Sequence, residues 1–460
     1  MTNTLTTLKH IHLIGIGGIG VSGLAEMMLS RGYAVTGSDM KASPITRRLE
    51  QKGARIFVGH APGHVADADL VVYTAAVRED NPELAQARAE GIPAVNRAEM
   101  LGMLMQEYTR SIAVSGTHGK TTTTSMLSVI LEKDGLDPTM LIGGDIREIQ
   151  GNAKAGKSPY LVAEACEYKD SFLSFHPHCA VILNIDEDHL DYFRDLDHIC
   201  DSFRRFAGQI TGGGFLVYNR DDANARRLGE AAATGAFSFG LTPEADCCAS
   251  EISFSPAGCA AFTVTFRGQV LGAVSLNVPG MHNVYNALAA ITAALAYGVS
   301  FTAVQDSLRV FEGARRRFEH RGHFNGATVV DDYAHHPTEI RATLAAAART
   351  DHGAVWCVFQ PHTYTRTAEL MDEFSTCFAE ADQVIITRIY ASREIDTLGV
   401  HGSQLAERIR QTGKSAVYLD TFEEIVSYLA DRAAPGDLIL TVGAGNIDDV
   451  ARLLTERTPA

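Results

Sequence analysis

The central motif of this chain is Ser111-Ile-Ala-Val-Ser-Gly-Thr-His-Gly-Lys-Thr-Thr-Thr-Thr-Ser125, an apolar run that leads into a glycine-bracketed turn. Glycines at both ends of such a turn allow backbone N–H groups to converge on an anion. Lys120 adds a mobile positive charge, and the hydroxyl of Thr121 or Thr122 can reach a magnesium ion. The helix predicted to begin near Thr121 directs the positive end of its dipole at the same place. The motif therefore predicts a nucleoside triphosphate site.

The phosphate-binding loop is a shortened variant. The usual pattern has a glycine six residues before the lysine, and this chain has Val114 there. A glycine turn without a ligand would also connect a strand to a helix, but it would leave Lys120, Thr121 and Thr122 without a role. We therefore keep the nucleotide site as the working hypothesis.

Composition excludes several classes of protein. The 460 residues are enough for two to four domains, and the formal net charge of −15 argues against a nucleic-acid partner. The longest basic cluster, Arg315-Arg316-Arg317, is too short for a nucleic-acid surface. The eight cysteines contain no Cys-x-x-Cys pair and are typical of reduced core residues. We therefore expect a cytoplasmic protein, and we predict no signal peptide and no membrane span.

A dinucleotide-type unit is predicted at the N-terminus. The run His10–Gly20 reads as a buried strand followed by glycines, residues 21–30 have helical composition, and Ala34–Asp39 reads as a second strand. This order is typical of a Rossmann unit in which Asp39 can hold a ribose hydroxyl. A nicotinamide or flavin cofactor and any other nucleotide diphosphate remain open as ligands. Further strands are expected at residues 55–58, 70–73 and 93–95, with a helix over residues 97–107.

A second α/β unit begins near Tyr108, and polar residues follow its strands. Strands are predicted at residues 140–142, 160–163 and 180–183. Ligands lie at the carboxyl ends of strands in such sheets. The polar residues found there are Glu164, Glu167, Asn184, Asp186, Asp188 and His189. They can neutralise charge around a phosphate-bound magnesium ion, or they can cap the following helices. Between about residues 212 and 279 the pattern shifts to alternating strands, which predicts an antiparallel extension.

A third unit is expected after Phe311. A long Ala-rich helix precedes it, ending near Gly298 with Asn283 in its first turn. Strands are predicted at residues 317–319, 328–333, 355–359, 384–387 and 438–442, most of them in a parallel sheet. Two polar runs follow these strands, Asp331-Asp-Tyr-Ala-His-His-Pro337 and Gln360-Pro-His-Thr-Tyr-Thr-Arg366. The first run is expensive to bury without a purpose. No repeat or low-complexity tract is present.

Taken together, these motifs resemble the Mur ligase family. The motifs that carry the resemblance are Gly116–Thr122, Glu164, Asn184–His189, His282-Asn283 and Asp331–Pro337. Within the family, Gly15–Gly20, Arg315–Phe318 and Gln360–Thr367 are similar to the branch that joins L-alanine to UDP-N-acetylmuramate. The resemblance covers nearly the whole chain. It implies an α/β fold of three domains: a Rossmann-like UDP-sugar domain over residues 1–108, a P-loop-type central ATPase domain with a mostly parallel sheet over residues 109–312, and a Rossmann-like amino-acid domain over residues 313–460.

The resemblance also implies a set of site residues. The UDP-sugar would be held by Gly15, Gly17, Gly18, Ile19, Gly20, Ser22, Asp39, His60, Thr74 and Arg97. ATP would be held by Gly116, Thr117, His118, Gly119, Lys120, Thr121, Thr122, Asn283, Arg317 and Asp332. The amino acid would be held by Tyr333, His335 and Arg366. Magnesium would be bound by Thr121, Glu164 and His189, and the catalytic residues would be Lys120, Glu164, His189, His335 and Arg366.

The implied reaction is an ATP-dependent ligation in peptidoglycan precursor synthesis. The lactoyl carboxylate of the sugar attacks the γ-phosphate of ATP, and the alanine amine attacks the resulting acyl phosphate, with His189 or His335 as its base. We expect ATP and Mg²⁺ as cofactors and a monomer or weak homodimer. The alternatives are a ligase that adds a whole tripeptide to the same sugar, an NAD-dependent dehydrogenase, and a nucleotide-switched binding protein.

Overall fold

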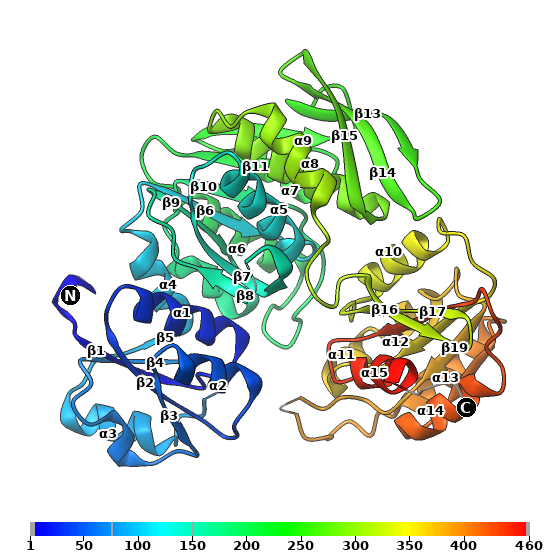
Figure 1. Ribbon diagram of the computed structural model, residues 1–460, viewed down its shortest axis with the longest axis horizontal. Coiled ribbons are helices and arrows are strands. Elements are labelled where there is room, and N and C mark those ends of the chain that lie inside the picture. The colour runs from blue at the N-terminus through cyan, green and yellow to red at the C-terminus, as the bar shows by residue number, and fades with distance from the viewer. Residues whose placement is uncertain (1–4, 75–76, 150, 393, 457–460) are drawn as a thin grey trace. The chain divides into compact units, whose positions relative to one another are not determined.

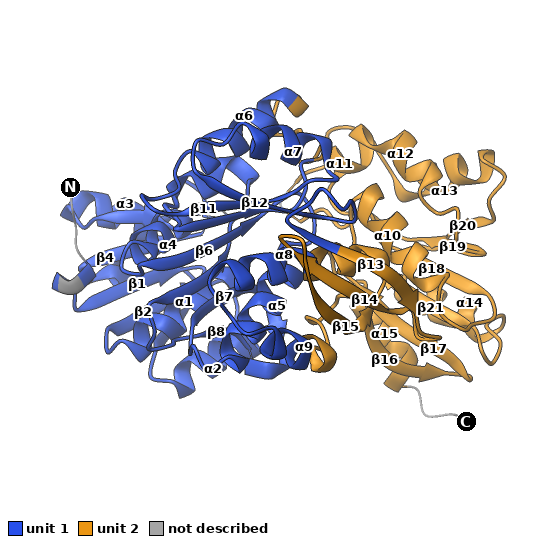
Figure 2. Ribbon diagram, turned by 90° about the horizontal axis from the view of Figure 1, so that it is seen from above, with its two compact units in different colours: residues 1–185, 197–248, 288–307 blue, residues 186–196, 249–287, 308–460 orange. Residues whose placement is uncertain are grey.

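The computed structural model describes residues 5–74, 77–149, 151–392 and 394–456. Its elements form three sheets with helices between the strands (Figure 1). The chain divides into two compact units, which are coloured separately in Figure 2. Unit 1 contains residues 1–185, 197–248 and 288–307, and unit 2 contains residues 186–196, 249–287 and 308–460. No helix in the described part of the chain is long and apolar enough to cross a membrane.

The first sheet of unit 1 is parallel, with strand order β3-β2-β1-β4-β5. Its elements, preceded by η1 (Leu5–Thr7), are β1 (His10–Ile14), α1 (Ile19–Ser30), β2 (Ala34–Asp39), α2 (Pro44–Gln51), β3 (Arg55–Val58), η2 (Pro62–Val65), β4 (Leu70–Tyr73), α3 (Pro82–Glu90), β5 (Ala94–Asn96) and α4 (Arg97–Met105). Every predicted strand of this segment is present, the last one shifted by a residue. The chain winds away from β1 in both directions, so the carboxyl end of β1 is a switch point where such folds bind ligands.

Within unit 1 the second sheet runs β12-β11-β10-β6-β9-β7-β8, and Cys247 and Cys248, the first two residues of β13, pair with β12, while the rest of β13 belongs to unit 2. Its elements are β6 (Arg110–Ser115), α5 (Lys120–Lys133), β7 (Thr139–Ile146), η3 (Arg147–Ile149), β8 (Gly151–Lys154), β9 (Tyr160–Glu164), η4 (Tyr168–Ser174), β10 (Cys179–Ile182), α6 (Leu196–Ala207), β11 (Phe215–Asn219), α7 (Ala223–Glu230), β12 (Gly235–Gly240) and β13 (Cys247–Phe254). The pairs in it are parallel except β7 with β8. β6 lies between β10 and β9, so the loop that opens α5 leaves the sheet at its centre.

The prediction of an antiparallel extension from residue 212 onward was wrong for its first half. β11 and β12 are parallel strands of the central sheet, with α7 between them. In β11 the residues Leu216, Val217 and Tyr218 are buried in succession, and a short apolar run of this kind does not reveal whether the neighbouring strands are parallel or antiparallel. The antiparallel character appears later, where β14 (Cys259–Phe266) pairs with β15 (Gln269–Pro279) in unit 2.

The third sheet belongs to unit 2 and runs β16-β17-β21-β18-β19-β20. After α8 (Met281–Ala296) and α9 (Phe301–Val310), its elements are β16 (Glu319–Phe324), β17 (Ala327–Asp332), α10 (Pro337–Ala347), β18 (Val355–Phe359), α11 (Tyr364–Glu369), α12 (Met371–Thr376), β19 (Gln383–Ile386), α13 (Gly402–Gln411), β20 (Ala416–Tyr418), α14 (Phe422–Ala430), β21 (Leu438–Val442) and α15 (Asp448–Glu456). The pairs are parallel except β16 with β17, a hairpin that the sequence did not predict.

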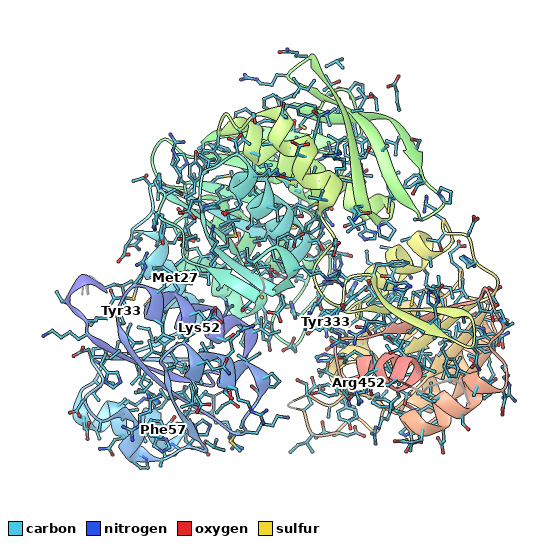
Figure 3. All side chains as sticks on the ribbon, in the orientation of Figure 1. Met27, Tyr33, Lys52, Phe57, Tyr333 and Arg452 are labelled. Carbon is cyan, nitrogen blue, oxygen red and sulfur yellow. The ribbon has the colours of Figure 1, made fainter. Side chains whose placement is uncertain are left out.

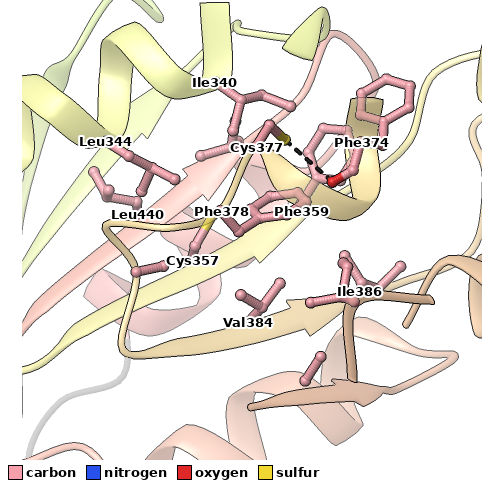
Figure 4. Packing of buried hydrophobic residues seen from close by; sticks show 14 of the residues in the cluster. Ile340, Leu344, Cys357, Phe359, Phe374, Cys377, Phe378, Val384, Ile386 and Leu440 are labelled. Carbon is pink, nitrogen blue, oxygen red and sulfur yellow. Dashed lines mark hydrogen bonds between the residues drawn. The ribbon is translucent and has the colours of Figure 1, made fainter. Parts of the chain in front are cut away.

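Both faces of this sheet are packed, which explains its continuous apolar strands. In β18 the side chains of Val355, Cys357 and Phe359 enter one core cluster, and those of Trp356 and Val358 enter the other. Figure 4 shows the first cluster, in which helical side chains cover the strand residues. Strands buried on both faces lose the period of two in hydrophobicity.

Candidate active site

The glycine turn after β1 is held by the end of β2. The N–H groups of Gly15 and Ile16 donate to the carbonyl oxygen of Ser38 at 2.8 and 3.1 Å, and the N–H of Gly17 donates to Asp39 Oδ2 at 2.9 Å. Gly15 has φ +78°, and a Cβ there would lie 2.6 Å from the Thr74 methyl group. The turn therefore requires glycine at this position.

Several residues predicted for the UDP-sugar lie around this turn. Arg97 begins α4 with its side chain against Gly20, where a Cβ would lie 3.0 Å from Arg97 Cδ. Asp39 and Thr74 contact Gly17 and Gly15. Ser22 differs from these residues, because its hydroxyl is buried and donates to the Ile19 carbonyl within α1 at 2.9 Å.

His60, also predicted for the UDP-sugar, follows the end of β3 and contacts the end of β2. Its Nδ1 is 3.1 Å from Ser38 Oγ and 3.1 Å from Glu83 Oε2. The N-terminal predictions thus gather at the switch point of the first sheet, and Glu83 is added to them by the structure.

The phosphate-binding loop is pinned by Asn184. The N–H of His118 donates to Asn184 Oδ1 at 2.8 Å, Asn184 Nδ2 donates back to the His118 carbonyl at 3.1 Å, and the Thr117 N–H donates to the Asn184 carbonyl at 3.1 Å. Gly116 (φ +144°) packs so closely that a Cβ would lie 2.9 Å from Leu183 Cβ. Gly119 (φ +86°) opens α5 without a side-chain cap. The first-turn amides of α5 therefore face the loop, as an anion site requires.

Lys120 is held inside the loop by Glu167. Its Nζ lies 3.0 and 2.9 Å from the two carboxylate oxygens and donates to the carbonyls of Gly116 at 2.5 Å and Thr117 at 3.0 Å. The side chains are 17% and 3% exposed, so the pair is largely desolvated. Burial opposes the charged ammonium, but the charge of Glu167 outweighs it and raises the pKa of Lys120.

Glu164 and Thr121 are oxygen donors near this lysine. Glu164 Oε1 accepts from the Gly143 N–H at 2.5 Å, and its charge contributes to the raised pKa of Lys120. Thr121 is buried in the first turn of α5. A carboxylate and a hydroxyl at a phosphate loop are donors that suit a hard divalent cation. His189, the third predicted metal ligand, belongs to unit 2, where its backbone has φ +57° and its N–H donates to Asp188 Oδ1 at 2.7 Å.

In unit 2, Asp332 organises the predicted ATP residues after β17. Its carboxylate accepts from the N–H groups of Phe318 and Ala334, both at 2.8 Å. Burial raises the pKa of Asp332 to about 6 against the opposing charge of Arg317. The guanidinium of Arg317 lies 5.2 Å from the ring centre of Tyr333. Arg317, Asp332 and Tyr333 are thus brought together.

Asn283 occupies the first turn of α8, as predicted. Its Nδ2 donates to the Pro279 carbonyl at 2.7 Å, and its Oδ1 accepts from Asn286 Nδ2 at 3.0 Å. The neighbouring His282 has a pKa lowered to about 4, by burial first and then by the charge of Arg317. A neutral imidazole and an amide therefore lie at the start of this helix.

Two of the three predicted amino-acid residues, His335 and Arg366, form a second cluster in unit 2, around Asp188, and the ring of Tyr333 lies 5.5 Å from that of His335 between centres. Arg366 Nη2 donates to Asp188 Oδ1 at 3.0 Å, with both side chains largely buried. Burial lowers the pKa of His335 to about 4, although the charge of Glu339 opposes it. His362 lies 5.9 Å from His335 between ring centres, and burial and that neighbour lower its pKa to about 3. The cluster offers one paired guanidinium and two neutral imidazoles at pH 7.

Three acidic residues acquire a role only in the structure. Glu167 holds Lys120, Asp188 holds Arg366 and Glu83 joins His60 to Ser38. The sequence signal for the first two was their place after strands of the central unit, which gave their position but not their partner. For Glu83 the sequence analysis offered no signal.

Comparison with known proteins gives the family. The α/β sheets and the lysine-bearing glycine loop indicate a nucleotide-binding protein. Family models match residues 10–109 ("Mur ligase family, catalytic domain"), 114–294 ("Mur ligase middle domain") and 316–445 ("Mur ligase, glutamate ligase domain"). The chain belongs to the Mur ligase family, as the resemblance predicted, and has its three domains.

Individual relatives are similar over nearly their full length. The chain is 51% identical to a UDP-N-acetylmuramate–L-alanine ligase of Acetivibrio thermocellus over 446 residues, covering 97% of this chain and 95% of that protein. It resembles the crystal structure of UDP-N-acetylmuramate-alanine ligase from Thermotoga maritima with a TM-score of 0.82 and 32% identity, covering 98% and 99% of the two chains. A murein peptide ligase from Psychrobacter arcticus gives a TM-score of 0.73 and 27% identity, covering 98% and 100%.

Proposed function

We propose that this chain is an ATP-dependent ligase that joins L-alanine to the lactoyl carboxylate of UDP-N-acetylmuramate, forming ADP and phosphate. The observation that carries the proposal is the sequence identity of 51% and 50% to two UDP-N-acetylmuramate–L-alanine ligases, in each case over 97% of this chain. The lysine loop at the centre of the second sheet supports it, because a phosphate site there would serve a ligase and would have no use in a dehydrogenase.

The residues of unit 1 supply the phosphoryl-transfer side of the proposed mechanism. The sugar carboxylate attacks the γ-phosphate and forms an acyl phosphate, and charge builds up on the transferring oxygens. Lys120 and the first-turn amides of α5 would stabilise this charge, since fixed donors in a desolvated site cost little reorganisation. Asn184 keeps the loop in shape through three hydrogen bonds.

Magnesium fits the proposed site. Thr121 and Glu164 would hold it, with His189 of unit 2 as a further proposed ligand, and the ion would supply neutralisation of phosphate charge. The remaining proposed ATP contacts are Gly116–Thr122, Asn283, Arg317 and Asp332. Their support is the family match together with the clustering of Arg317 and Asp332.

The amino-acid side of the proposed mechanism uses Arg366, Tyr333 and His335. Arg366 would bind the alanine carboxylate. The alanine ammonium must lose a proton before it can attack, and His335 is a poor acceptor for that proton. An α-ammonium has a pKa of about 8, so proton transfer to an imidazole of pKa about 4 costs about 5 kcal/mol. This argues against His335 as the base and favours it as a neutral acceptor that orients the amine.

The N-terminal sheet would hold the UDP-sugar at Gly15–Gly20, Asp39, His60, Thr74 and Arg97. Support comes from the switch-point position of the turn and the contacts of Thr74 and Arg97 with it. The proposed domain limits are residues 1–108, 109–312 and 313–460. We also propose that the chain acts in the cytoplasm as a monomer or weak homodimer.

One assay tests the function. Phosphate release from ATP is measured with UDP-N-acetylmuramate and with L-alanine, a tripeptide or no amine, and the product mass is determined. We expect release that requires both sugar and alanine, with a product heavier by one alanine residue. Release that requires the tripeptide would favour the recycling ligase, and release without any amine would contradict a ligase.

A further inference from the structure

The N-terminal domain contains a buried carboxylate that the proposed mechanism does not use. Glu83 lies in the first turn of α3 with its side chain fully buried. Its Oε2 accepts from Ser38 Oγ at 2.6 Å and lies 3.1 Å from His60 Nδ1, and its Oε1 lies 2.6 Å from His64 Nδ1. One carboxylate therefore joins the end of β2, the loop after β3 and η2.

A third histidine faces the same carboxylate. His12 is fully buried in β1, and its Nε2 lies 3.7 Å from Glu83 Oε2 without a hydrogen-bond partner among the described residues. Its Nδ1 lies 2.8 Å from Thr36 Oγ1, so the ring is fixed from the other side. The ring of His64 stacks on Phe57 at 4.1 Å between centres, and Figure 3 marks Phe57 in this domain.

The surroundings keep Glu83 ionised. Burial alone would raise the pKa of Glu83, but its contacts with His12, Ser38 and His64 lower it to about 2. A buried carboxylate is costly unless it is paired and hydrogen-bonded. The group is therefore a fixed negative charge whose partners are held in one geometry.

One of the partners of Glu83, Ser38, also holds the glycine turn. The carbonyl of Ser38 receives the N–H groups of Gly15 and Ile16, and the next residue, Asp39, receives that of Gly17. Glu83 holds the hydroxyl of the same Ser38 and the imidazole of His60. The carboxylate of Glu83 thus contacts both His60 and the residue that holds the glycine turn.

We propose that Glu83 is a positioning residue of the UDP-sugar site, which fixes the end of β2 beneath the glycine turn and the ring of His60. That the ligand of this site is a UDP-sugar rests on the proposed function. A site that must hold a diphosphate gains from donors that are already in place, because misplacement of a hydrogen-bond donor weakens binding without altering the reaction centre.

The test is Glu83→Gln in the full-length chain, which keeps the shape of the side chain and removes its charge. We expect KM for UDP-N-acetylmuramate and the dissociation constant for UDP to rise at least tenfold. The kcat at saturating sugar and KM for ATP should stay within about threefold. Unchanged sugar KM and UDP affinity, or an equal rise in KM for ATP, would overturn the proposal.

Glu26→Gln is the matched control. Glu26 is also a buried carboxylate of this domain, paired with Arg48 at 2.9 Å and with Lys52 at 2.6 Å (Figure 3 marks Lys52). It should lower thermal stability without changing UDP affinity. If both variants weaken UDP binding equally, the effect is general destabilisation and the proposal is wrong.

A second variant covers failure of Glu83→Gln to fold. Ser38→Ala removes only the hydroxyl between Glu83 and the turn and should raise the UDP dissociation constant severalfold; no change would contradict the proposed link. If the wild type binds UDP but forms no ADP with sugar and alanine, the proposed function is wrong. The UDP affinities of these variants would then still decide the role of Glu83.

Discussion

Replacement of Glu167 by glutamine tests how the phosphate-binding loop is held without nucleotide. Glu167 is 3% exposed and pairs with Lys120, which is 17% exposed. The variant leaves the ammonium buried with the carbonyls of Gly116 and Thr117, and among the described residues no other carboxylate forms an ion pair with it. Loss of the charge should destabilise the central domain.

The size of the effect follows from the geometry. At the 2.9 Å separation of Nζ and Oε2 and an effective dielectric constant of about 20, the attraction is about 6 kcal/mol before desolvation is subtracted. Removal of one partner of a buried pair typically costs about 3 to 5 kcal/mol, and the partial exposure of Lys120 favours the lower end. A loss of about 3 kcal/mol corresponds to a thermal midpoint lower by about 6 to 12 °C for a domain of this size.

ATP should reverse most of this loss, because its phosphates bring negative charge back to Lys120. The assay is thermal unfolding with and without saturating ATP, supported by hydrogen exchange of α5. Glu132→Gln is the control, since Glu132 pairs with Lys154 in the same domain but is 43% exposed, and its midpoint should move by no more than about 2 °C. A deficit that persists unchanged in ATP, or no deficit without it, would refute the reasoning.

Three further predictions follow from the site. Lys120→Ala should lower kcat by at least about 100-fold, measured as ADP formation, and leave UDP affinity within a few fold, whereas Lys133→Ala at the other end of α5 should change neither. For Asp332, the folded pKa of about 6 lies above the usual 3.8, so its stabilising contribution is complete below pH 3.8 and lost as pH rises through 6. Asp332→Asn, which does not titrate, should therefore gain about 2 kcal/mol relative to wild type as the pH rises from 4 to 7, measured by urea unfolding. For His335, the folded pKa of about 4 lies below 6.5, so the folded state loses stability as pH falls from 6.5 towards 4; His335→Asn should be less sensitive to acid by about 2 kcal/mol at pH 4.5 in the same measurement, and equal sensitivity would contradict burial of a neutral imidazole.

The sequence predicted the elements around the glycine turns most accurately. The second strand has the predicted limits, Ala34–Asp39, and α5 begins at Lys120, one residue before the predicted start. These elements are short, bounded by glycine or charge, and buried, so local composition determines them. The family resemblance then supplied the residues that local composition leaves ambiguous, such as Arg97 and Thr74.

The contacts across the fold were not predictable in this way. Arg366 and Asp188 are 178 residues apart, and Glu83 and Ser38 are 45 apart, so only the tertiary structure reveals them as partners. The parallel strands β11 and β12 were missed for a related reason. Which strand edge a chain segment joins depends on the sheet as a whole, and hydrophobic alternation within the segment does not specify it.

The internal partners of the proposed substrate-binding cations bear on selectivity. Lys120 in unit 1 and Arg366 in unit 2 are each buried against a carboxylate, Glu167 and Asp188 respectively. A buried cation without such a partner would be costly, so the carboxylate stabilises the substrate-free protein. The proposed substrates present anions to both sites, a triphosphate to Lys120 and an amino-acid carboxylate to Arg366. Only a ligand with comparable negative charge can share or replace the internal carboxylate, because a neutral ligand would leave the pair intact. The same ion pairs that lower substrate affinity therefore exclude neutral analogues from both sites.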